Sequence, residues 1–108
     1  MAFTAGTLAD GQAATSLTTI YTVPASTKAY IKSWTIYNTN AATQTVGCYV
    51  KRSGSTARQY RQFSLDQNES ADVLSPGTSI QLSTGDVLQM ITTTATALDY
   101  MVTGVTEA

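Results

Sequence analysis

The stretch KAYIKSWTIYN, residues 28–38, decides the fold class of this chain. It is crowded with β-branched and aromatic residues and carries no helical period. The apolar alternation changes phase between Ile31 and Trp34, which predicts a β-bulge near Lys32 or Ser33. We therefore expect a long strand with one buried face.

Shorter runs of the same kind lie on both sides of this stretch. They predict further strands at residues 16–23, 44–52, 57–65, 71–74, 80–82, 87–91 and 98–105. Eight short strands separated by turns, with no segment of helical period, predict an all-β fold. An eight-stranded β-sandwich can have jelly-roll or immunoglobulin-like topology, and the strand pattern leaves both open.

Three turn sequences separate these strands. The segment SGST at residues 53–56 predicts a hairpin, because Gly54 can adopt a positive φ. The segment SPGT at residues 75–78 has the proline and glycine of a type II turn. In STGD, residues 83–86, we expect the carboxylate of Asp86 to accept hydrogen bonds from nearby backbone N–H groups.

A length of 108 residues suits one domain. Residues 1–15 hold only Phe3 and Leu8 as sizeable apolar side chains, so we predict an extended N-terminal arm there and a single β-sandwich domain at 16–108. Phe3 and Leu8 are then expected to anchor the arm in a partner's groove. Strand 57–65 has no strongly apolar face, which predicts an edge strand or an interface.

The chain has few charges and nearly balances them. Charged residues make up 12% of the sequence, with six basic and seven acidic residues. Six basic residues are too few for a nucleic-acid footprint, and no apolar run reaches the length of a membrane span. Few charges leave sheet edges open to pairing, which favours a homo-oligomer. The single cysteine, Cys48, is expected to be a buried small apolar residue.

No residue set for catalysis or metal binding is evident. The chain has no histidine and so lacks the commonest general base and zinc ligand. Oxygen-bearing side chains recur at every second residue from Asp66 to Asp72, but Ala71 and Gly77 stand where a calcium loop needs glycine and glutamate. We therefore expect no enzyme activity, no bound metal and no cofactor.

One concentration of positive charge is a candidate binding site. The predicted hairpin brings Lys51, Arg52, Arg58 and Arg61 together, with Tyr60 between them. One interpretation is a solvated hairpin tip. The other is a docking patch for an acidic protein surface, since arginine and tyrosine are enriched at binding hot spots.

Two segments resemble small bacteriophage virion proteins. Residues 20–39, IYTVPASTKAYIKSWTIYNT, followed by the strand from Gln44 to Val46, are similar to the opening of that family, and IQLSTGD at 80–86 resembles its turn before the penultimate strand. The similarity covers roughly residues 17 to 105. It implies a β-sandwich, with jelly-roll topology favoured over immunoglobulin-like, that coats or cements an icosahedral capsid or belongs to a tail or fibre.

The resemblance leads to a specific functional expectation. The chain is expected to be a capsid decoration or cement protein, made in the host cytoplasm, that binds the major capsid protein on the virion surface as a homotrimer. The alternative is a tail or fibre module that binds a host-surface glycan. The family has no catalytic residue to transfer to this sequence.

Overall fold

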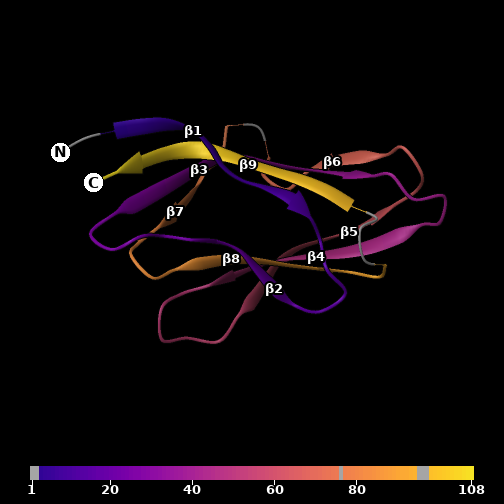
Figure 1. Cartoon of the computed structure of the whole chain (residues 1–108), viewed down its shortest axis with the longest axis horizontal. Helices are drawn as coiled ribbons and strands as arrows, with labels where there is room; N and C mark the ends of the chain where they lie inside the picture. The colour runs from indigo at the N-terminus through magenta and orange to yellow at the C-terminus, as the bar shows by residue number, and fades with distance from the viewer. Residues whose placement is uncertain (1–2, 76, 95–97) are drawn as a thin grey trace.

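Two antiparallel sheets account for all the regular structure in the computed structural model, which describes residues 3–75, 77–94 and 98–108 (Figure 1). Sheet A holds β1 (Phe3–Gln12), β9 (Leu98–Glu107) and β3 (Lys28–Asn38), followed by β6 (Ser70–Asp72) and β7 (Ile80–Leu82), which both pair with β3. Sheet B holds, in order, β2 (Thr18–Thr22), β8 (Val87–Thr92), β4 (Gln44–Lys51) and β5 (Arg58–Leu65). The predicted all-β class is confirmed.

The strand order is that of a jelly roll. Strands β6 and β7 pair with the two halves of β3 and so fill one strand position between them. With β6 and β7 sharing position 6, β8 takes position 7 and β9 takes position 8. The order is then 1-8-3-6 in sheet A and 2-7-4-5 in sheet B. Only positions 4 and 5 are neighbours both in the chain and within a sheet, and the β4–β5 hairpin joins them. The sequence pattern also gave eight strands, but it counted β6 and β7 separately and did not include β1.

Strand β3 occupies residues 28–38, as predicted, and pairs with β9 along its whole length. The register shifts between Ile31 and Ser33, which confirms the predicted bulge at Lys32. The bulge lets Ile31 and Trp34, although three residues apart, both point into the core, where neither has exposed surface. The change of phase in the apolar pattern of the sequence therefore results from the bulge.

The core lies between the two sheets and takes side chains from both. Its largest fully buried apolar members are Trp34, Ile31, Ile36, Leu82, Leu88, Met90 and Leu98. Cys48 is also fully buried, as expected, and burial raises the pKa of its thiol to about 12. This thiol is therefore protonated and shielded at neutral pH.

Strand β1 differs from the expected arm. The segment is extended, but it is paired with β9 from Phe3 to Gln12 and forms an edge of sheet A (Figure 1). Leu8 and Ala9 are partly buried against the chain's own core, whereas the other eight residues of β1 are exposed. Because neither face of β1 is fully covered, its sequence carries no apolar alternation that could have predicted a strand.

Two predicted turns are present. Gly54 has a φ of +77°, and the N–H of Ser55 donates to the carbonyl of Arg52 at 2.9 Å in the β4–β5 hairpin. The N–H of Thr78 donates to the carbonyl of Ser75 at 3.1 Å across a turn that contains Gly77, at φ +81°. Pro76, which belongs to the same predicted turn, lies outside the described residues.

Candidate functional site

A groove of about 450 Å³ lies between the β4–β5 hairpin of sheet B and strand β7 of sheet A. Apolar side chains of Val50, Tyr60 and Ile80 line it, together with the guanidinium groups of Arg52 and Arg58. Small hydroxyl residues and Gln81 complete the lining. The groove therefore combines apolar surface with positive charge, and three of the five predicted hairpin residues line it.

A bulge in β5 places Arg58 and Tyr60 in this groove. Cys48 pairs with Arg61 and Tyr49 with Gln59, so Tyr60 is the extra residue in β5. The bulge explains why the sequence of β5 shows no consistent apolar face, and the predicted edge position of this strand is confirmed. Tyr60 is 44% exposed, so its ring is available to a partner.

Arg58 is the uncompensated cation of the groove. Its side chain is exposed, and among the described residues its guanidinium group forms no hydrogen bond or ion pair. It lies opposite Val50 in the β4–β5 ladder, so its charge is next to apolar surface. A guanidinium group in this setting suits a carboxylate, which it can bind with two parallel hydrogen bonds.

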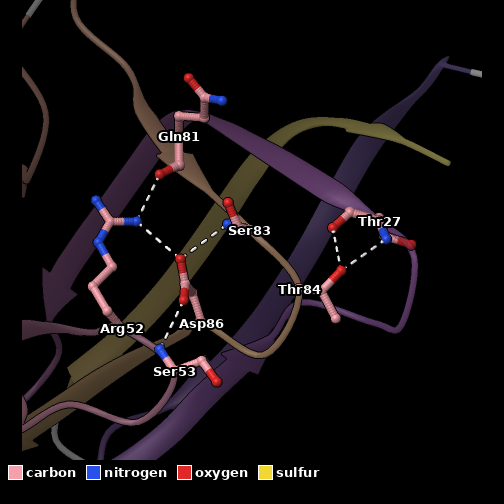
Figure 2. Close-up of polar contacts among 7 residues, drawn as sticks. All are labelled: Thr27, Arg52, Ser53, Gln81, Ser83, Thr84 and Asp86. Atoms are coloured by element: carbon pink, nitrogen blue, oxygen red, sulfur yellow. Dashed lines mark hydrogen bonds and ion pairs between the residues drawn. The ribbon is translucent and has the colours of Figure 1, made fainter.

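Arg52 lines the groove as well, but it also holds the surrounding structure together. Its Nη1 donates to the carbonyl of Gln81 at 2.8 Å and to Oδ2 of Asp86 at 3.0 Å (Figure 2). These contacts tie the β4–β5 hairpin to β7 and to the start of β8. The side chain remains 54% exposed, so part of the guanidinium group still faces solvent.

Asp86 is the acceptor at the centre of this corner (Figure 2). Its Oδ1 accepts from the N–H of Ser53 at 2.8 Å, and its Oδ2 accepts from the N–H of Ser83 at 2.9 Å. Burial by itself would raise the pKa of this carboxyl, but the two backbone donors and Arg52 outweigh it and the pKa is lowered. The predicted turn-fixing role of Asp86 is confirmed.

Two further hydrogen bonds fix the other side of the same turn. The hydroxyl of Thr84 accepts from the N–H of Thr27 at 3.0 Å and donates to the carbonyl of Thr27 at 2.9 Å (Figure 2). The 83–86 turn is thereby bonded both to the β2–β3 connection and to the β4–β5 hairpin. The side chains of Arg52, Thr84 and Asp86 thus join three segments that are distant in sequence: the β2–β3 connection, the β4–β5 hairpin and residues 81–86.

Arg61 faces a different part of the molecule. Its Nη1 donates to the carbonyl of Val73 at 3.2 Å, and its guanidinium carbon lies 4.9 Å from the centre of the Phe63 ring. The contact with Val73 links β5 in sheet B to the segment after β6 in sheet A. Arg61 thus joins the two sheets and does not line the groove.

The remaining predicted site residues do not gather at the groove. Lys51 follows Val50 on β4 and is not part of the groove lining. Phe3 lies in β1 and is 63% exposed, whereas Leu8 packs against the chain's own core. The five hairpin residues and the two β1 residues therefore belong to separate surfaces.

The sequence did not indicate the sheet A side of the groove. Ile80 and Gln81 come from β7, which the chain reaches about thirty residues after β4. Nothing in the local sequence of β7 distinguishes these residues from ordinary strand residues. Only the jelly-roll pairing places β7 beside the β4–β5 hairpin.

The described part of the chain holds neither a cluster of metal-binding side chains nor a membrane-spanning helix. Within residues 3–75, 77–94 and 98–108, no three acidic or cysteine side chains gather as a metal site would require. The same residues include no helix that is long and apolar enough to cross a membrane.

Comparisons with known proteins identify the fold but no family. No protein-family model matches the sequence, and no curated protein matches it. Among solved structures, the chain is similar to a subunit from work titled "Bacillus endospore appendages form a novel family of disulfide-linked pili". The TM-score is 0.58 at 16% identity, and the match covers 98% of this chain and 88% of that one. This likeness is one of fold.

A second match is a chain of infectious bursal disease virus, Gx strain. It has a TM-score of 0.37 at 10% identity and covers 97% of this chain but 32% of the viral one. Neither matched structure is a bacteriophage protein, so the resemblance to phage virion proteins stays a prediction.

Proposed function

We propose that this chain is a non-enzymatic structural protein of a virion, a capsid decoration protein that binds an acidic segment of the major capsid protein in the groove between the sheets. The observation that supports this proposal is the unpaired Arg58 beside the exposed ring of Tyr60 and the apolar side chains of Val50 and Ile80. A carboxylate would bind Arg58, and an adjoining apolar side chain would cover Tyr60.

The proposal depends on assembly of many copies. A groove of this size provides a small contact, which is weak for one copy but adequate when many copies bind one shell. A disulfide-linked assembly, as named for the matched appendage subunit, does not suit this chain, because its one cysteine is fully buried in the core. Association here would be noncovalent.

The test is co-sedimentation with tail-less capsids built from the major capsid protein of the same phage. We expect the wild-type chain to sediment with the capsids, and the double variant Arg58→Ala/Tyr60→Ala to lose at least about tenfold in affinity. Lys51→Ala is the matched control, because it removes a nearby positive charge that does not line the groove. Absence of wild-type binding, or equal binding by the double variant, would refute the proposal.

A second candidate function is a tail or fibre module that binds a neutral host glycan. One observation favours it: a shallow hollow of about 230 Å³ whose side chains are uncharged. Tyr49, Gln59 and Gln62 line it together with Thr45 and neighbouring residues of β8. An aromatic ring with amide and hydroxyl groups beside it suits a sugar ring.

The two candidates predict different locations. A decoration protein follows the heads, and a glycan-binding module follows the tails. If the chain sediments with isolated tails, and Tyr49→Ala reduces adsorption of particles to the host whereas Tyr60→Ala does not, the glycan function replaces the capsid function. Sedimentation with tail-less heads excludes it.

A further inference from the structure

We propose that strand β1 pairs with β1 of a second copy, antiparallel and centred on Ala5, so that sheet A continues across a two-fold axis. The occupant of this edge is thus another copy of the same chain. This inference does not depend on the groove or on the capsid as a partner.

Strand β1 gains little from its own chain. Eight of its ten residues are exposed, and among the described strands it pairs in the sheet with β9. Fixing the backbone of a residue costs conformational entropy, and the net gain from one hydrogen bond does not exceed that cost. A strand that buries only Leu8 and Ala9 in part is therefore poorly compensated, and a second strand on its open edge would supply further hydrogen bonds.

The other edges of the two sheets are protected against such pairing. Strand β5 carries Arg58 and Arg61 and has a bulge at Tyr60. Strand β2 has five residues and a register shift between Thr19 and Tyr21. Strands β6 and β7 have three residues each. These are the usual devices that prevent edge-to-edge association.

The first half of β1 has none of these devices. Residues 3–7 are uncharged, contain no proline and pair with β9 in regular register. The register shift of β1 occurs between Thr7 and Ala9, and its single charged residue, Asp10, lies beyond that shift. The regular, uncharged stretch therefore ends at Thr7, and its centre is Ala5.

The chemistry of this stretch suits pairing with itself. An antiparallel pair centred on Ala5 places Phe3 opposite Thr7 of the second copy, and Thr4 opposite Gly6. Phe3 is 63% exposed, and an aromatic residue opposite a β-branched one is a favourable cross-strand pair. Both Asp10 carboxylates lie outside the paired segment, so the two strands bring no like charges together.

The test places charge on the two-fold axis. Ala5 is exposed, so Ala5→Lys and Ala5→Glu should leave the fold intact, which thermal unfolding at low concentration verifies. Sedimentation velocity from about 1 to 500 μM in low salt should show a wild-type dimer in the micromolar range. Each variant alone should associate at least about tenfold more weakly, because like charges then lie directly opposite each other. An equimolar mixture of the two variants should recover a heterodimer.

Ser64→Lys is the matched control, since it adds the same charge at an exposed position on the edge strand β5 of the other sheet. It should dimerise like the wild type. A monomeric or trimeric wild type, an undiminished dimer of Ala5→Lys, or a mixture that fails to associate would each overturn the proposal. The capsid test is independent, because Arg58→Ala/Tyr60→Ala should still dimerise and Ala5→Lys retains the groove.

Discussion

The corner around Asp86 and strand β1 are built in opposite ways. At the corner, one buried carboxylate collects two backbone donors and an arginine, and a threonine pair bonds the other side of the same turn. Strand β1 has ten residues in regular structure but leaves eight of them exposed. Specific polar contacts thus hold the corner beside the groove, whereas β1 leaves one long edge of sheet A open.

The largest effect is expected at Gly104, in the strand that connects β1 to the rest of sheet A. A Cβ at this position would meet the carbonyl oxygen of Tyr30, part of the backbone of β3. Since backbone cannot move aside as a side chain can, Gly104→Ala should cost about 4 kcal/mol of unfolding free energy or prevent folding. Chemical denaturation measures the loss.

Gly47→Ala is the matched control for this prediction. Gly47 is also a strand glycine, but its nearest atom is the ring end of Tyr49, which can rotate away. We expect a loss of about 1 kcal/mol. Equal losses for the two variants would show that the close approach of β3 and β9 is not the cause.

The next largest effect should come from the corner. Asp86→Ala leaves the N–H groups of Ser53 and Ser83 without their acceptor and removes the partner of Arg52. We expect a loss of about 3 kcal/mol in equilibrium unfolding. Asp72→Ala, at an exposed carboxylate of sheet A, should change stability by less than about 0.5 kcal/mol. A comparable loss at both positions would contradict the distinction between corner and surface.

The same corner predicts a pH dependence. Because the pKa of Asp86 is lowered in the folded state, the unfolded chain binds this proton more readily. The contribution of Asp86 is therefore complete above the unfolded pKa of about 4 and is lost as pH falls through the folded pKa. Unfolding curves from pH 7 down to pH 2 should show the stability gap between wild type and Asp86→Asn narrowing in acid. A constant gap would exclude this linkage.

The smallest effect is expected in β1. Phe3→Ala should change the stability of the monomer by less than about 0.5 kcal/mol, because the side chain is 63% exposed. Val102→Ala in the neighbouring strand, fully buried, should cost about 2–3 kcal/mol. The unfolding free energy of Phe3→Ala should be measured at about 1 μM and again near 200 μM protein, because a loss of stability that grows with concentration indicates an interface between copies.

Strong local signals in the sequence account for what could be predicted. The density of β-branched and aromatic residues at 28–38 predicts strand β3, and the change of apolar phase within it predicts the bulge. The turn at Asp86 was recognised because glycine followed by aspartate at the start of a strand has a specific local chemistry. The class of fold followed from the number and spacing of such segments.

Signals of this kind are absent where the prediction differed from the structure. Strand β1 has no apolar alternation, so composition favoured a loose arm. Arg52, Arg58 and Arg61 look alike in the sequence, yet Arg52 bonds Asp86, Arg61 bonds the carbonyl of Val73 and Arg58 is unpaired. Their roles depend on residues 12 to 34 positions away, which a local pattern does not contain.

The local sequence is sufficient to predict the all-β class, the main strand and its bulge, the turns and the burial of Cys48, because each depends on the properties of neighbouring residues. Contacts between distant segments place β1 at a sheet edge and bring β7 beside the hairpin to form the groove. They also leave Arg58 as the one arginine whose side chain has no partner among the described residues. Those features arise where segments distant in the chain meet, and the physical reason is that jelly-roll strands pair mainly with strands that do not follow them in sequence.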